Sequence, residues 1–252
     1  MTMKSETDPL DLDAQQVALA AVQEDDFRAA NLNQMVASRL APGSVLDVGC
    51  GGGGLVASLL RAGHDARGID VSPPIIAAAK RYFEGHGFDP ERVSAEPLAS
   101  LVARGARFDN VVSMDCLEHV ENDEAMFSEL VEIVRPGGTL VITVPALSWI
   151  YGQRDADIGH YRRYEKSRLR ALIVGRSLRI EELRFWNVLG VLPRLVNEKL
   201  LGRRMDESFR YGEVTLKKRL LRGGLDLWFS TVERWVRPPL GLTLVMKASR
   251  EL

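Results

Sequence analysis

Apolar and polar positions along the chain follow two periods in turn, and this alternation predicts a sheet covered by helices. Short apolar runs indicate buried strands, and the segments between them carry apolar residues at helical spacing. The expected strands are 45–48, 66–69, 92–95, 108–114 and 139–144, separated by expected helices 55–61, 74–83, 98–103 and 123–134. Repeated units of this kind form α/β folds with a parallel sheet, which bind ligands beyond the carboxyl ends of their strands.

The segments on either side of this repeat follow other patterns. Spaced apolar positions over 13–40 predict a helix before the first strand. After the repeat we expect a helix over 165–174, strands over 178–186 and 240–248, and amphipathic helices over 188–201 and 216–235. We therefore expect a single domain, residues 1–252, made of an N-terminal helical segment (13–42), a core (43–186), a helical insertion (187–239) and a last strand (240–252).

A cluster of glycines follows the first expected strand, and an acidic residue ends the second. Gly49, Gly51 and Gly53 have the spacing G-x-G-x-G, and Asp70 comes about twenty residues later. Glycines allow a tight turn that approaches a ligand closely, and the later carboxylate is placed to bind ribose hydroxyls. Asp47, just before the turn, would repel a pyrophosphate but suits a cationic group. The segment thus favours a nucleoside with an amine and no phosphate over NAD.

Composition and charge narrow the class of protein. The chain has 252 residues, of which 46% are hydrophobic and 27% charged, and its net charge of -1 gives no overall field to attract nucleic acid. The two cysteines, Cys50 and Cys116, lack metal-ligand spacing, so we expect no metal. Isolated thiols are typical of a reducing compartment, and the N-terminal residues lack the apolar core of a signal peptide, so we expect a cytoplasmic protein.

Four segments resemble, in order, the motifs of class I S-adenosylmethionine-dependent methyltransferases: 45–55, 68–70, 108–120 and 134–140. The sequence Glu118-His119-Val120 is similar to that of the quinone-biosynthesis methyltransferases and their small-molecule relatives. The resemblance covers roughly residues 43–186 and the last strand. It implies a Rossmann-like sheet of seven strands, mostly parallel with the last antiparallel, with helices on both faces. It also implies S-adenosylmethionine as cofactor and S-adenosylhomocysteine as product.

The resemblance also implies which residues contact the cofactor. They are Asp47, Gly49, Cys50, Gly51, Gly53, Asp70, Val71, Glu96, Met114 and Asp115. The three glycines would line the methionine and ribose part, Asp70 would hold both ribose hydroxyls and Asp47 would orient the amino group. Glu96, or the backbone beside it, would bind the adenine amine, although Glu96 departs from the usual motif, which has Asp earlier. Met114 and Asp115 would lie beside the sulfonium.

Two histidines are candidate catalytic bases. A hydroxyl or ammonium group that receives a methyl must lose a proton, and histidine suits that task near neutral pH. His119 follows the fourth expected strand and His160 follows the fifth, so both fall at the carboxyl edge of the sheet. Alternatively, His119 caps the following helix and His160 is a hydrogen-bonded loop residue. His64 and His86 are expected at the surface.

A candidate substrate site follows His160 directly, at Tyr161, Arg162, Arg163 and Tyr164. Two guanidinium groups flanked by phenols can bind a phosphate or carboxylate through paired hydrogen bonds. The alternative is a loop pinned to the rim of the sheet by arginine–carboxylate pairs. These four residues therefore predict either recognition of an anionic or polyol substrate or a purely structural loop.

The predicted function is methyl transfer to a hydroxyl or amine of a small molecule, such as a natural product or an intermediate of a lipid or glycan pathway. A second possible enzyme is a transferase that uses another nucleoside, such as an aminopropyl donor. The sequence has no additional acidic cluster that would support this alternative. The alternative from another class is a catalytically silent cofactor-binding protein. Segment 115–118 lacks the Asn/Asp-Pro-Pro-aromatic signature, so we expect no nucleic-acid substrate. The basic, Trp-containing insertion is interpreted as a lid, a homodimer interface or a peripheral membrane contact.

Overall fold

The structure is a computed structural model that describes residues 26–200 and 216–252. The expected first helix is therefore described only in part, as α2 (Phe27–Ala37), and the middle of the predicted insertion lies outside the described residues. Asp26 begins α2, because its side chain accepts hydrogen bonds from the backbone N–H groups of Arg28 and Ala29. No helix in the described ranges is both long enough and apolar enough to cross a bilayer.

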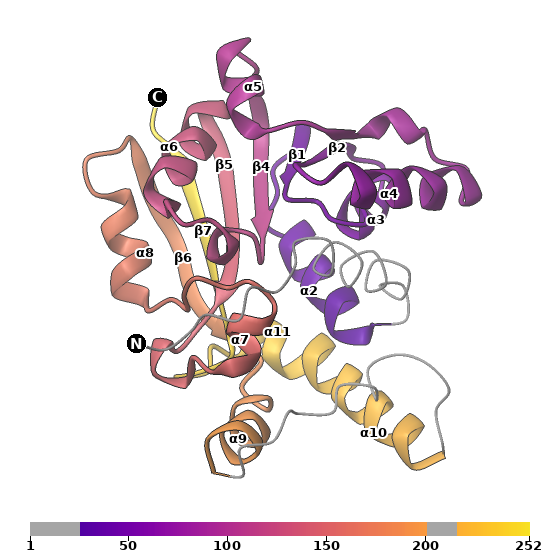
Figure 1. The fold of residues 1–252 in the computed structure, drawn as a ribbon, viewed down its shortest axis with the longest axis vertical. Helices are drawn as coiled ribbons and strands as arrows, with labels where there is room; N and C mark the ends of the chain where they lie inside the picture. The colour runs from indigo at the N-terminus through magenta and orange to yellow at the C-terminus, as the bar shows by residue number, and fades with distance from the viewer. Residues whose placement is uncertain (1–25, 201–215) are drawn as a thin grey trace.

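Seven strands form one sheet in the order β3-β2-β1-β4-β5-β7-β6 (Figure 1). Their bounds are β1 Ser44–Val48, β2 Asp65–Asp70, β3 Val93–Ala95, β4 Phe108–Met114, β5 Val134–Pro145, β6 Leu178–Trp186 and β7 Thr243–Arg250. Strands β1 to β5 pair in parallel, and β7 lies antiparallel between β5 and β6. The predicted sheet, including its antiparallel last strand, is confirmed.

Helices cover both faces of the sheet, because successive strand residues point to opposite sides. The covering helices are α3 Gly54–Arg61, α4 Pro73–Gly85, α5 Leu98–Ala103, α6 Asp123–Ile133 and α8 Lys166–Ile173, together with α2. Leu46 of β1 packs in one core cluster, with α5, α6 and α8, whereas its neighbour Val45 packs in another, with α2, α3 and α4. Both faces of the central strands are therefore apolar, as the continuous runs in the sequence indicate.

A further group of helical segments lies beside the carboxyl edge of the sheet (Figure 1). They are α7 Gln153–Asp157, α9 Val191–Arg194 with the π-helical turns Leu195–Leu200, α10 Leu216–Leu227, the π-helical turns Trp228–Val232, and α11 Glu233–Trp235. The last strand begins at Thr243 rather than at the expected position 240. At Gly241 an added Cβ would lie 2.3 Å from the backbone oxygen of Trp186, so the incoming chain packs against the end of β6 before it joins the sheet.

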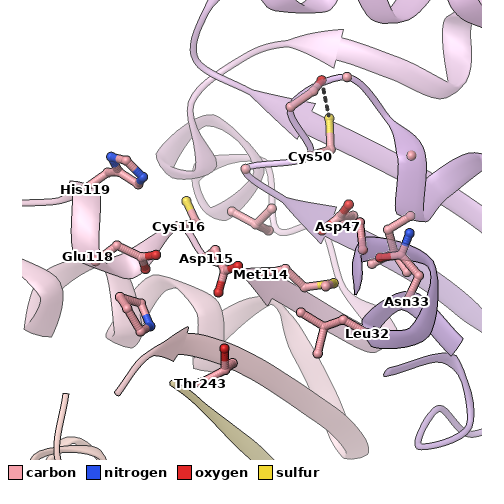
Figure 2. Close-up of a pocket in the computed structure, with 18 of the residues that line it drawn as sticks. Leu32, Asn33, Asp47, Cys50, Met114, Asp115, Cys116, Glu118, His119 and Thr243 are labelled. Atoms are coloured by element: carbon pink, nitrogen blue, oxygen red, sulfur yellow. Dashed lines mark hydrogen bonds between the residues drawn. The ribbon is translucent and has the colours of Figure 1, made fainter. Parts of the chain in front are cut away.

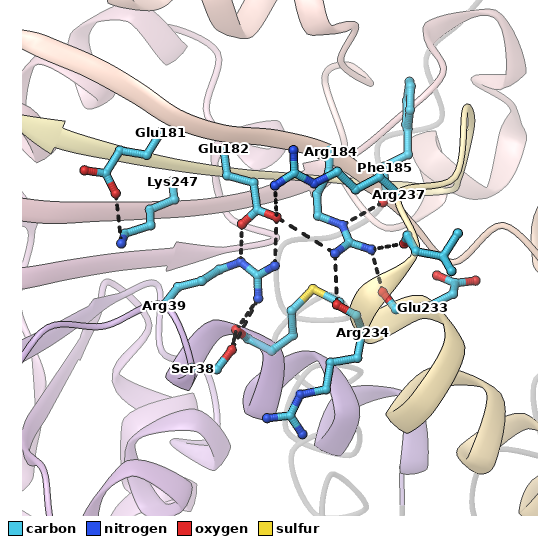
Figure 3. A network of polar contacts seen from close by, with 12 residues as sticks. Ser38, Arg39, Glu181, Glu182, Arg184, Phe185, Glu233, Arg234, Arg237 and Lys247 are labelled. Atoms are coloured by element: carbon cyan, nitrogen blue, oxygen red, sulfur yellow. Dashed lines mark hydrogen bonds and ion pairs between the residues drawn. The ribbon is translucent and has the colours of Figure 1, made fainter.

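A buried polar network attaches α2 and the C-terminal helices to β6 (Figure 3). Arg39, just after α2, donates two hydrogen bonds to the Glu182 carboxylate, at 2.6 and 3.0 Å. Arg184, with 3% of its surface exposed, donates to the carbonyl oxygens of Glu233 and Val236, the second at 2.6 Å. These carbonyls end a helix and have no partner within it, so the guanidinium stabilises that end.

We predict that Arg184→Met lowers the free energy of unfolding by about 2–4 kcal/mol, because buried carbonyl groups lose their donors. Urea unfolding followed by circular dichroism measures the change. Arg179→Met is the matched control on the same strand, since that side chain is 70% exposed, and it should change stability by less than about 0.5 kcal/mol. Equal destabilisation by the two variants would contradict this role for Arg184.

Candidate functional site

A cavity of about 1840 Å³ lies at the carboxyl ends of β1, β2, β3 and β4. This is more than a single drug-sized ligand needs, which is roughly 300–1,000 Å³. Figure 2 shows Asp47 and Cys50 at one side of the cavity, Glu118 and His119 at the other, and Met114 and Asp115 between them. The cavity therefore has room for two reactants, one at each side, and we call these sides the β1–β2 side and the histidine side.

Asp70 organises the β1–β2 side of the cavity. It lies at the end of β2, and its two carboxylate oxygens accept hydrogen bonds from the backbone N–H groups of Gly51 and Ser72, both at 3.0 Å. At Gly51, which has a φ of +52°, an added Cβ would meet no protein atom within 4 Å. The backbone of this turn thus faces open space beside a carboxylate, which suits a ligand with paired hydroxyls.

Asp47 is a buried carboxylate that faces this side of the cavity. Only 3% of the surface of Asp47 is exposed, and its Oδ1 has no hydrogen-bond partner among the residues described. Burial, and to a smaller extent the charge of Asp70, raises the pKa of Asp47 to about 7. A buried polar group without a partner is costly, so this position fits a ligand that brings a cation or a hydrogen-bond donor.

Gly53 has a packing role in the turn between β1 and α3. Unlike Gly49, Cys50 and Gly51, it does not line the cavity. Gly53 has a φ of +78° and precedes α3, and a Cβ added there would lie 2.7 Å from Cε2 of Phe83. The turn and the packing of α3 against α4 therefore require glycine at this position.

The other expected cofactor contacts lie around the same side. Val71, Glu96, Met114 and Asp115 all line the cavity. The Glu96 carboxylate already accepts hydrogen bonds from Arg104, at 2.6 and 3.1 Å, and these hold its pKa below the usual range. Asp115 has a φ of +47° and accepts a hydrogen bond from the Thr143 hydroxyl. Strained residues of this kind cluster at functional sites.

The histidine side brings the two candidate bases together. The rings of His119 and His160 meet edge to face, with centroids 4.6 Å apart. Burial, and secondly the nearby His160, lowers the pKa of His119 to about 4. His119 does not cap the following helix, because Asn122 does so through a hydrogen bond to the Ala125 N–H. Both rings line the cavity, and their catalytic role stays a prediction.

A buried carboxylate, Asp155 of α7, lies behind His160. Its Oδ1 is 3.4 Å from Nδ1 of His160, and two arginines pair with it: Arg163 at 2.8–2.9 Å and Arg194 at 3.0 Å. Burial alone would raise the pKa of Asp155, but the neighbouring His160 and Arg163, with the charge of Arg194, hold it below the usual range. The network therefore keeps a fixed negative charge next to one nitrogen of His160.

Three of the four residues expected to bind substrate do not line the cavity. Tyr164 is fully buried, with its hydroxyl 3.1 Å from Asp123, and Arg162 donates to the backbone oxygens of Val120 and Glu121. Tyr161 is half exposed outside the cavity. Arg163 lines the cavity but is paired with Asp155. The geometry favours the structural alternative, in which these residues pin the loop to the rim.

Several residues of the cavity were missed from the sequence. Glu118, Asp155 and Arg194 line the histidine side, and residues of α2, such as Leu32 and Asn33, form another wall. Glu118 carried a signal, because it lies beside His119 in the sequence. The others come from segments whose patterns predict only helices or loops.

Glu118, His119 and His160 each offer one atom that could bind a metal ion, and these atoms lie within 4.8 Å of one another. In the described part of the chain, no other group of three such residues is this close. Proximity alone does not indicate a metal, since a carboxylate beside two histidines is equally suited to moving protons. The expectation that no metal binds stays a prediction.

Comparison with known protein families decides the class of this chain. Residues 22–187 match the family described as a methyltransferase domain. This is well over half of the chain. The chain belongs to this methyltransferase family. Methyltransferases of this class take their methyl group from S-adenosylmethionine. The unpartnered Oδ1 of Asp47, the open Gly51 turn and Asp70 fit its amino group and ribose.

Curated relatives of this methyltransferase include proteins named as ubiquinone biosynthesis O-methyltransferases. The chain is 35% identical over 122 residues to a ubiquinone biosynthesis O-methyltransferase of Methylobacterium sp. (strain 4-46), covering 48% of this chain and 49% of the relative. It is 37% identical over 103 residues to the protein of the same name from Methylococcus capsulatus, covering 40% and 43%. The chain thus matches less than half the length of these relatives.

Solved structures share the fold of this methyltransferase. Magnesium protoporphyrin IX methyltransferase from Synechocystis PCC 6803, with bound S-adenosylmethionine, has a TM-score of 0.51 at 16% identity, over 95% of this chain and 84% of that one. The [4+2]-cyclase SpnF has a TM-score of 0.57 at 19% identity, over 89% and 82%. The same fold therefore occurs in proteins named for different reactions, so function depends on the site.

We predict that Asp70→Asn weakens binding of S-adenosylhomocysteine by about 10- to 100-fold. An amide cannot accept from both the Gly51 and Ser72 N–H groups and still hold ribose hydroxyls through charge-assisted hydrogen bonds. Titration calorimetry measures the affinity. Asp65→Asn, at the opposite end of β2 beside Arg92, is the control and should bind normally. Unchanged affinity in Asp70→Asn would contradict the assignment.

We also predict that binding of S-adenosylhomocysteine near neutral pH releases a proton from Asp47. With a pKa of about 7 the group is about half protonated at pH 7, and an ammonium beside it lowers that pKa. The affinity should therefore fall as the pH falls below 7. Calorimetry in buffers with different enthalpies of ionisation measures the released protons. Asp47→Asn should lose this release, and a release equal to that of the wild type would refute the prediction.

Proposed function

We propose that this methyltransferase transfers a methyl group from S-adenosylmethionine to a hydroxyl of a small molecule. The observation that carries the proposal is a single cavity with two chemically different sides. One side has carboxylates and an open glycine turn, and the other has groups able to accept a proton. The names of the curated relatives support hydroxyl rather than amine methylation. A catalytically silent cofactor-binding protein would not need buried proton acceptors on the histidine side of the cavity.

The chain's own residues supply orientation and exclusion of water. The cofactor, when bound, supplies an activated methyl group. Asp70 and the turn at Gly51 hold the nucleoside, and Asp47 orients its amino group. Met114 and Asp115, at the end of β4, lie between this side and the histidines, so they border the path between the two reactants. Positioning of this kind accounts for a large share of the rate in such displacements.

The helical insertion forms a wall of the acceptor pocket in this proposal. Arg194 of α9 and Leu221, Leu225 and Phe229 of the following helices line the cavity. A wall of this kind excludes water from the reacting groups and selects the acceptor by shape. A homodimer interface or a membrane contact through the exposed surface of the insertion is compatible with the same arrangement.

The proposal is tested by incubating the protein with S-adenosylmethionine and a metabolite extract, followed by mass spectrometry. We expect a compound that gains one methyl group on oxygen, together with stoichiometric S-adenosylhomocysteine. The Asp70→Asn variant should form the same product more slowly at low cofactor concentration. A protein that binds S-adenosylhomocysteine but methylates no hydroxyl compound, in the extract or in a panel of phenols, would refute the proposal.

A further inference from the structure

Glu118 is the least satisfied charged side chain on the histidine side of the cavity. It follows β4, in the turn Leu117–His119, and none of its surface is exposed to solvent. Neither carboxylate oxygen has a hydrogen-bond partner in ranges 26–200 and 216–252. The side chain nevertheless lines the cavity, and Figure 2 shows it beside His119. A buried carboxylate without partners destabilises the fold, so its presence points to a role in function.

The groups facing Glu118 prepare it to exchange a proton. Nε2 of His160 lies 3.8 Å from its Oε1, and the other nitrogen of His160 faces Asp155. Asp155 stays ionised because Arg163 and Arg194 pair with it. His160 therefore lies between two buried carboxylates, one facing each of its ring nitrogens. Among the charged groups that act on Glu118, Asp115 and Asp155 oppose its ionisation, and Arg163 favours it.

His119 is a weaker candidate for the base. Burial and the neighbouring His160 hold its pKa near 4, so it binds a proton poorly at neutral pH. A buried carboxylate next to an imidazole has a higher proton affinity than an exposed one, because burial, and then the charge of Asp115, raises its pKa. General bases work best when their proton affinity is matched to the pH of the reaction.

We propose that Glu118 is the catalytic base of this site. In this proposal His160, which faces Asp155, positions Glu118 and then accepts the proton from it. This inference rests on the proposed hydroxyl methylation. The acceptor oxygen forms a bond to the methyl carbon while the carbon–sulfur bond breaks, and the hydroxyl proton moves to a carboxylate oxygen of Glu118. The sulfonium and the carboxylate lose their charges in the same step. The proton then passes through His160 to solvent.

Two variants test this assignment against a structural role. Glu118→Gln keeps the shape of the side chain but cannot take a proton, and Glu121→Gln, an exposed residue nearby, is the matched control. With catechol as the first hydroxyl probe, we expect Glu118→Gln to lower kcat by about 100-fold or more. Its affinity for S-adenosylhomocysteine should stay within about twofold of the wild type. Glu118→Asp, which keeps a carboxylate, should recover part of the activity.

Thermal unfolding supplies a measurement independent of activity. Since burial holds the pKa of Glu118 above its unfolded value, its ionisation opposes folding as the pH rises above that value. Glu118→Gln lacks this cost, so its Tm should equal or exceed that of the wild type, with the difference growing from acidic to neutral pH. A structural carboxylate would give a lower Tm instead.

The outcomes separate this inference from the function on which it rests. Glu118→Gln with kcat within about threefold of the wild type overturns the assignment of the base, and so does a lower Tm with loss of cofactor binding. If catechol is not methylated, the comparison is made with the hydroxyl acceptor identified from the extract. A wild-type protein that binds S-adenosylhomocysteine but methylates no hydroxyl compound overturns the proposed function itself.

Discussion

The Asp70 carboxylate joins the two loops on which the β1–β2 side of the cavity depends. It accepts one hydrogen bond from the β1–α3 turn, at Gly51, and one from the start of the next loop, at Ser72. These loops follow adjacent parallel strands, so their positions relative to each other are set by the sheet and then locked by this side chain. The carboxylate is oriented before any ligand arrives, which lowers the cost of binding.

The histidine side of the cavity is organised by a second set of charged residues, which come from segments distant in the sequence. Asp155 is held by Arg163 from the following loop and by Arg194 from the insertion, and it faces His160. Buried ion pairs of this kind contribute little to stability on balance, but removing one partner is expensive. The insertion is therefore connected to the histidine side of the cavity by a buried ion pair as well as by apolar packing.

The hydrophobic core and the cavity have opposite effects on the stability of the fold. The core clusters on both faces of the sheet are apolar and well packed, and Arg184 satisfies the carbonyls at the end of the C-terminal helices. Asp47 and Glu118, in contrast, are buried carboxylates whose oxygens include atoms without partners within the structure described. Such violations of packing rules, confined to one cavity in an otherwise consistent fold, are typical of sites that act on ligands.

The sequence by itself determined the order of strands and helices in the core, the antiparallel last strand expected from the family resemblance, and the family. Glycine spacing and short apolar runs are local signals, and they placed Asp47 and Asp70 correctly at one edge. Only the tertiary structure decided that Gly53 packs against Phe83, that Arg162 and Tyr164 bond to neighbouring protein groups instead of lining the cavity, and which carboxylates lie at the histidines. The physical reason is that side-chain contacts between distant segments leave no periodic trace in the sequence.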